Sequence, residues 1–86
     1  MPRLSEFYGI VIWMYYGDHP PPHFHATYGE HVAQVAIDTL AVLAGSLPTR
    51  ALPLVEEWGE LHREELLANW QRALGRVPLG RINPLP

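Results

Sequence analysis

Three histidines surround a run of three prolines in residues 18–26, and there the residue types and spacing favour chemistry. Proline rings hold the backbone dihedral φ near about −65° and remove backbone donors, so we expect a stiff bridge here. If the chain is extended after the prolines, His23 and His25 lie on one side of a strand and Phe24 on the other. The pattern therefore predicts two imidazoles that face the same space.

The first interpretation of this histidine segment is a metal site. Imidazole nitrogen is a common ligand of zinc, copper, nickel and iron(II), and a carboxylate oxygen can complete such a set. The spacing corresponds to none of the standard zinc signatures, so the prediction depends on residue types and strand geometry. We predict that a divalent transition metal is held by His19, His23, His25 and Asp18, with His31 as an alternative further ligand.

Two other interpretations stay open for the same histidines. In one, His23 and His25 catalyse acid–base chemistry near neutral pH without a metal, while Arg50 stabilises a phosphate group in RNA cleavage. In the other, the imidazoles have a structural role and form hydrogen bonds with backbone carbonyls around the proline turn. The sequence therefore leaves open whether the chain is an enzyme.

The composition excludes several other kinds of site. The chain has no cysteine, which excludes disulfides, thiolate metal sites and cysteine nucleophiles and fits a reducing cytoplasm. It also has no lysine, so its six formal cations are arginines and lysine Schiff-base chemistry is excluded. The net charge of −3 disfavours non-specific nucleic-acid binding, although a local arginine cluster keeps RNA open as a partner.

The length of the chain predicts one small domain over residues 1–86. A domain of this size buries only somewhat more than about 60% of its unfolded surface, so a homo-oligomer or a partner protein would add stability. The longest unbroken apolar run, Ile10–Tyr16, is far shorter than the roughly 20 residues that cross a bilayer. We therefore expect a cytoplasmic protein without a membrane segment.

Alternating and β-branched residues predict an antiparallel sheet in the first half of the chain. Both faces of the first strand are apolar, so this strand is either covered twice or presents Trp13 and Tyr15 to a partner. Gly29-Glu30 is expected to be the tight turn of a hairpin. The predicted strands cover residues 7–16, 24–28, 31–38 and 40–44.

The second half of the chain has a helical pattern that begins near residue 49 and ends at Gly75. Its two apolar stripes lie about half a turn apart, which predicts a break near Leu61–Arg63 or one long helix that packs on two different surfaces. An extended tail over residues 77–86 follows. The predicted fold class is α+β, with a small antiparallel sheet of three to four strands, then one long or two shorter helices.

Short motifs with a common pattern occur over nearly the whole chain. They are Phe7-Tyr8-Gly9-Ile10, Met14-Tyr15, Asp18-His19, Pro21-Pro22-His23-Phe24-His25-Ala26, Gly45-Ser46-Leu47-Pro48, Glu57-Trp58 and residues 61–70. In these motifs the chain resembles a family of short bacterial proteins classed as a domain of unknown function. Members are commonly encoded beside a second very small protein, an arrangement similar to toxin-antitoxin pairs.

This resemblance implies a small partner protein that is encoded nearby. We therefore expect the chain to be one component of a toxin-antitoxin-like module that acts through this partner, with the histidine-proline segment as its recognition or active site. The alternative is a small metal- or histidine-dependent enzyme, such as an RNase. The resemblance does not indicate which side of such a pair the chain would occupy.

Overall fold

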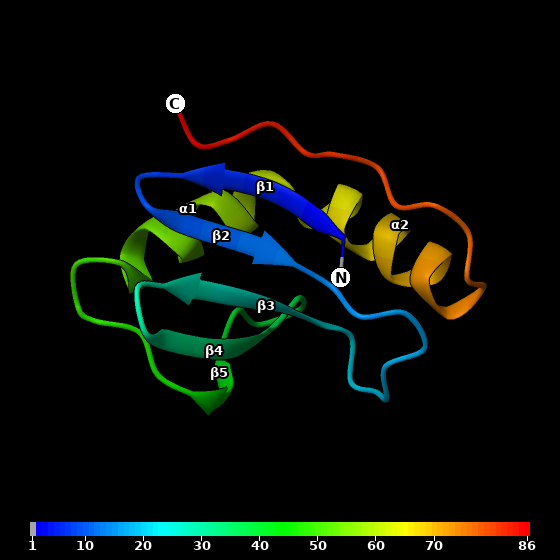
Figure 1. Cartoon of the computed structure of the whole chain (residues 1–86), viewed down its shortest axis with the longest axis horizontal. Helices are drawn as coiled ribbons and strands as arrows, with labels where there is room; N and C mark the ends of the chain where they lie inside the picture. The colour runs from blue at the N-terminus through cyan, green and yellow to red at the C-terminus, as the bar shows by residue number, and fades with distance from the viewer. Residues whose placement is uncertain (1) are drawn as a thin grey trace.

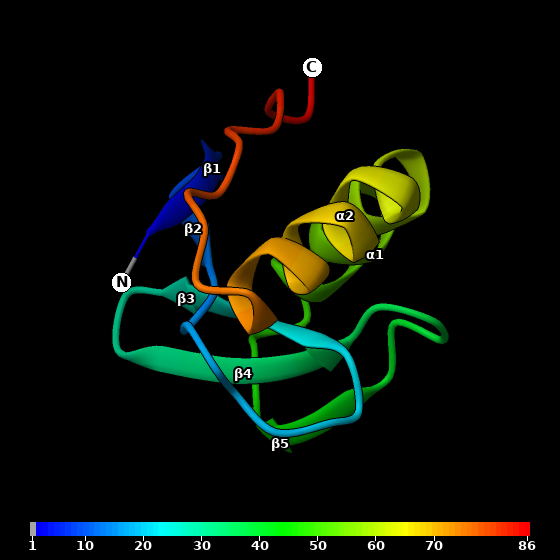
Figure 2. The ribbon, with the colours of Figure 1, turned by 90° about the vertical axis from the view of Figure 1, so that its right-hand side faces the viewer.

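The computed structural model describes residues 2–86. Within them, five strands form one antiparallel sheet in the order β1-β2-β3-β4-β5, and two helices pack on one face of it (Figures 1 and 2). The α+β class is confirmed, but the predicted number of three to four strands is wrong. The strands are Arg3–Phe7 (β1), Ile10–Trp13 (β2), His23–Tyr28 (β3), His31–Ala36 (β4) and Val42–Gly45 (β5).

The additional strand is β1, which lies before the segment predicted as a strand over residues 7–16 and shares only Phe7 with it. Tyr8 and Gly9 have φ values of +49° and +82°, as the two central residues of a type I′ hairpin turn do. β1 and β2 pair antiparallel across this turn, with Phe7 opposite Ile10. Asparagine or aspartate before glycine is the usual signal for such a turn, and tyrosine does not give it.

β3 is the central strand and carries the two buried histidines. It pairs with β4 around the predicted Gly29-Glu30 turn and with β2 on its other side, where Trp13 lies opposite His25. Phe24 points into the hydrophobic core, whereas His23 and His25 lie on the opposite face of the sheet. The predicted alternation along this strand is therefore confirmed.

The two helices are α1 (Leu52–Leu61) and α2 (Arg63–Leu74), and His62 lies between them. His62 has a non-helical φ of −122°, which confirms the predicted break and the alternative of two helices. Because of the break, both helices bury a stripe against the same sheet, including Trp58 of α1 and Trp70 of α2. No helix in residues 2–86 is long and apolar enough to cross a membrane.

The tail after α2 is non-helical and runs beside β1 (Figures 1 and 2). The Ile82 N–H donates a hydrogen bond of 2.8 Å to the Leu4 carbonyl, and the Trp58 indole N–H donates one of 2.8 Å to the Asn83 carbonyl. Ile82 and Leu85 are buried in the core. The tail therefore covers the gap between the outer edge of β1 and the helices.

Candidate metal centre

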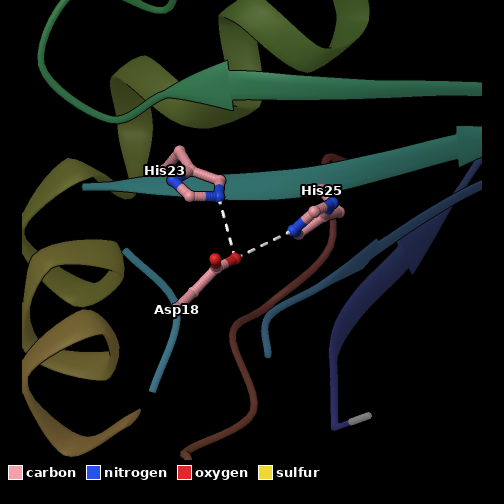
Figure 3. A group of neighbouring side chains, drawn as sticks. All are labelled: Asp18, His23 and His25. Atoms are coloured by element: carbon pink, nitrogen blue, oxygen red, sulfur yellow. Dashed lines mark hydrogen bonds and ion pairs between the residues drawn. The ribbon is translucent and has the colours of Figure 1, made fainter. Parts of the chain in front are cut away.

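The loop over residues 14–22, between β2 and β3, holds Asp18 next to the histidines. Near its middle, the Gly17 N–H donates a hydrogen bond of 3.1 Å to the Ala73 carbonyl at the end of α2. At its end, the Pro22 carbonyl accepts a bond of 3.0 Å from the Ile37 N–H. Anchored in this way, the loop directs the Asp18 carboxylate toward both imidazoles of β3 (Figure 3).

One carboxylate oxygen lies close to both histidines. Asp18 Oδ2 is 3.0 Å from His23 Nε2 and 3.4 Å from His25 Nε2 (Figure 3). One ligand atom from each of the three residues lies within 4.8 Å of the other two. The histidine side chains are almost fully buried, and that of Asp18 is 13% exposed. The structure thus brings together three of the residues that the sequence singles out.

The position of the proton on His23 follows from its second contact. His23 Nδ1 lies 2.7 Å from the Pro21 carbonyl oxygen, and a carbonyl only accepts, so Nδ1 must donate. In the neutral ring, Nε2 then carries a lone pair that faces Asp18 Oδ2, which is also an acceptor. Two acceptors this close need a positively charged species between them, either a proton or a metal ion.

Aromatic rings surround the two imidazoles. The Trp13 ring stacks on His25, with centroids 4.2 Å apart and an interplanar angle of 13°, and Tyr15 meets His25 edge-on at 4.9 Å. Trp70 lies 5.2 Å from the His23 ring. Trp13, at 9% exposure, covers His25. The sequence held a signal for this contact, because Trp13 and Tyr15 were predicted on a shared face of their strand. The position of His25 beneath them could be known only from the strand register.

Burial and hydrogen bonding act on the pKa values of the cluster. Burial is the largest influence on Asp18 and raises its pKa, but the His19 backbone N–H, the His25 hydrogen bond and the charge of His23 together hold the pKa below its usual value. Burial lowers the pKa of His25, and the hydrogen bond with Asp18 opposes that effect only in part. An ionised Asp18 beside a neutral His25 is therefore favoured, which suits metal binding.

The remaining predicted site residues lie outside this cluster. The His19 side chain is 89% exposed, and its Nδ1 is 3.2 Å from Asp18 Oδ1, the other carboxylate oxygen. Arg50 lies near the opposite end of β3, where its guanidinium carbon is 6.0 Å from the centre of the Tyr28 ring. His31 is also at that end, opposite Tyr28 in the hairpin. The structure therefore does not bring Arg50 or His31 beside His23 and His25.

Comparison with known proteins gives a family and no activity. A family model described as a domain of unknown function, DUF4160, matches residues 9–71. This range includes Asp18, His23 and His25 and excludes β1 and the tail. No curated protein and no solved structure matches the chain. The chemistry of the cluster therefore has to carry the functional argument.

Proposed function

The chain belongs to the DUF4160 family of domains of unknown function, and we propose that Asp18, His23 and His25 bind one divalent transition-metal ion for hydrolytic chemistry. Two imidazoles and one carboxylate are the ligands of many catalytic zinc sites, which keep a further position open for water. Mononuclear iron(II) sites use the same ligand set. Zinc is the ion that we assign first, because hydrolysis needs no redox change.

The convergence of two Nε2 atoms on one carboxylate oxygen is the observation that supports this proposal most. Zinc bonds of about 2.0–2.1 Å at tetrahedral angles separate neighbouring ligand atoms by about 3.3 Å. The separations from Asp18 Oδ2 are 3.0 Å to His23 Nε2 and 3.4 Å to His25 Nε2. Since one ligand atom of each residue lies within 4.8 Å of the others, small side-chain rotations would let one ion reach all three.

The hydrogen bonds behind the ligands also favour a metal. A metal-binding histidine usually donates its other ring N–H to a carbonyl or carboxylate, which orients the ring. His23 does this through Nδ1 and the Pro21 carbonyl. Asp18 Oδ1 accepts a bond of 2.9 Å from the His19 N–H, so Oδ2 is left to face the imidazoles. These contacts hold the ligand atoms in position before an ion binds.

Three protein ligands leave a coordination position for water. A bound zinc ion would lower the pKa of such a water to about 7, which would supply a hydroxide nucleophile at neutral pH. His19 is exposed and lies next to Asp18, so its ring can exchange protons between this water and solvent. RNA, which the sequence leaves open as a substrate, has phosphodiester bonds that such a nucleophile cleaves.

Calorimetric titration of the untagged chain with Zn²⁺ tests the proposal. We expect one ion per chain and a higher unfolding temperature when zinc is present. His23→Ala, His25→Ala and Asp18→Ala should each weaken binding by more than about 100-fold, because even residues behind the ligands account for 10–100-fold. His31→Ala is the matched control, since His31 is an exposed histidine on the same hairpin, and it should leave the affinity unchanged.

A proton shared by Asp18 and His23 is the alternative to a metal, and the same titration distinguishes the two. Zinc affinity that is equal in the parent chain and in all three cluster variants would assign the cluster a purely structural role. Growth of a bacterial host on induction of the single gene adds a functional readout. Growth arrest that His23→Ala or His25→Ala relieves, in folded protein, would support catalysis at this centre.

A partner-dependent function is a second candidate, and we propose it for the β5 edge of the sheet. β5 is an edge strand, and Val32, Val42 and Leu43 are exposed by 47%, 37% and 46%. Edge strands with apolar side chains pair readily with another chain. The small protein that the family resemblance leads us to expect nearby, in a toxin-antitoxin-like module of the cytoplasm, is the partner we assign to this edge.

Co-expression with the neighbouring small protein tests this second candidate. We expect the two chains to co-purify and Leu43→Lys to separate them, whereas His19→Ala, an exposed change in the loop between β2 and β3, should leave the complex intact. Co-purification that Leu43→Lys does not weaken would contradict the assignment of this edge. Self-association of the chain alone that Leu43→Lys abolishes would show instead that the edge forms a homo-oligomer.

A further inference from the structure

A pocket of about 350 Å³ lies at the other end of β3, between the β1–β2 turn and the beginning of α1. This volume falls within the range of small-molecule sites. Its walls combine aromatic, apolar and charged side chains, which is the composition of such sites. The residues that matter here are Tyr8, Tyr28, Arg50, Leu54, Glu57 and Leu85.

Tyr8 forms one wall of the pocket although its backbone conformation is unfavourable. Its φ of +49° is uncommon for a bulky residue, and the turn would favour asparagine or glycine. The ring is 60% exposed, so burial in the core does not explain the tyrosine. Its hydroxyl donates a hydrogen bond of 2.7 Å to the Pro86 carbonyl, and this bond fixes the orientation of the ring. Strained backbone of this kind is concentrated at functional sites.

Tyr28 and Arg50 form a second, charged wall. A side-chain carbon at Gly9 would lie 3.3 Å from the Tyr28 ring, so the ring packs closely on the backbone of the turn and is held in place. The Arg50 guanidinium carbon lies 6.0 Å from the centre of the Tyr28 ring. Among residues 2–86, no carboxylate forms an ion pair with Arg50. The guanidinium is therefore free to bind an anion.

The pocket also has an apolar floor and a charged residue at its rim. Leu54 is half-buried and Leu85 is almost fully buried, so the floor is apolar. Glu57 is exposed on α1, one helical turn after Leu54. A ligand in contact with the floor would thus meet an acceptor at Glu57 and a donor at Arg50, on a surface bordered by two aromatic rings.

We infer that this pocket binds a planar aromatic ligand that carries an anionic group. The ring would stack on Tyr8 or Tyr28, as aromatic pairs do, and the anion would accept bidentate hydrogen bonds from Arg50. Glu57 would accept a hydrogen bond from a ring N–H or amino group. A nucleoside monophosphate and an amino-substituted aromatic carboxylate share this chemistry. The site is separate from the metal centre, so the inference does not depend on the proposed function.

NMR titration of ¹⁵N-labelled protein tests the inference, with adenosine monophosphate and 4-aminobenzoate as the two probes. We expect saturable amide shifts at Gly9, Tyr28 and Leu54 with at least one probe. A preference for one of the two then identifies the source of the anion. Arg50→Ala should weaken binding by about tenfold, the usual result of losing a charge-assisted contact, and adenosine without phosphate should lose a similar factor.

Tyr8→Asn is the second variant, because asparagine suits the turn and the fold should persist. It removes one aromatic wall and should weaken both probes by about tenfold, with the unfolding temperature unchanged within a few degrees. Arg3→Ala, which removes an exposed arginine of β1, is the matched control and should not alter binding. The inference is overturned if neither probe shifts these amides at several millimolar, or if Arg50→Ala and Tyr8→Asn both bind like the parent chain.

Discussion

The polar groups at the two ends of β3 differ in burial and in pairing. At the beginning, His23 and His25 are almost fully buried and share one oxygen of Asp18. At the end, Tyr28 borders an open pocket whose only cation, Arg50, is exposed and forms no ion pair within residues 2–86. One strand therefore carries a closed polar cluster and an open aromatic pocket, about 17 Å apart by its length.

This contrast indicates what kind of ligand each end can take. Buried polar groups must be fully satisfied, because an unpaired one costs about 1–3 kcal/mol. The closed cluster therefore suits a single ion, which takes the place of a proton after small side-chain rotations. Exposed groups such as Arg50 and Glu57 are hydrated when no ligand is bound, so leaving them without a protein partner costs little free energy. The open pocket therefore suits a larger ligand that brings its own charge and its own ring.

The largest expected effect on stability comes from substitution of Trp58, because both ends of β3 rest on the core around this residue. Its ring lies 5.4 Å from Phe7 and 5.8 Å from Phe24. Trp58→Ala should lower the free energy of unfolding by about 3–5 kcal/mol, and both ends should lose their ligands together. Chemical denaturation followed by circular dichroism measures this. Trp58→Phe, which loses the hydrogen bond to Asn83 and leaves a smaller cavity than alanine does, should cost about 1–2 kcal/mol. An equal cost for both variants would contradict the packing argument.

A smaller effect is expected at the closed end alone. With a chelator present, Asp18→Ala should lower the free energy of unfolding by about 1–3 kcal/mol, since two buried imidazoles lose their shared partner. Glu57→Ala at the open end should change it by less than about 0.5 kcal/mol. Asp18→Asn refines the test, because its amide N–H can donate to a neutral His23 Nε2. We expect it to recover part of the stability but none of the zinc affinity.

The smallest expected effect is a dependence of stability on pH. It arises in the cluster of Asp18, His23 and His25 at the closed end of β3. His25 has a lowered pKa, so below its ordinary value of 6.5 the unfolded chain takes up more protons than the folded chain. The metal-free protein should therefore lose stability as the pH falls through 6.5, and again below 3.8 as Asp18 is protonated. Thermal unfolding with a chelator, from pH 8 to 5, measures the first step. His25→Gln should flatten that slope; a variant with the unchanged slope would exclude His25 as its source.

Local patterns predicted much of the fold. Alternation along His23, Phe24 and His25 needs only the strand geometry, and the break at His62 follows from two apolar stripes that one straight helix cannot bury. The Tyr8-Gly9 turn could not be predicted in this way, because it forces tyrosine into a conformation that its residue type disfavours. The strand before this turn, Arg3–Phe7, was not predicted, and the strand count was wrong for that reason.

The sequence predicted which residue types form the candidate site, but it predicted their arrangement in space only in part. Asp18 was named as a ligand beside the histidines, but its approach to them depends on the bond between Gly17 and Ala73, residues 56 positions apart in the chain. Arg50 was predicted to act with His23 and His25, and nothing local could place it. The connection from β5 to α1 carries it to the other end of β3. Tertiary contacts of this kind have no signature in a single sequence.

The contact between Leu4 and Ile82 has a consequence for how the protein is made. The edge of β1 gains this hydrogen bond only when a segment 78 residues later has arrived. The tail must therefore leave the ribosome before β1 is covered, and contacts between such distant segments slow folding. Until then the exposed edge is open to other nascent chains, so we expect the domain to close only once the tail has been made.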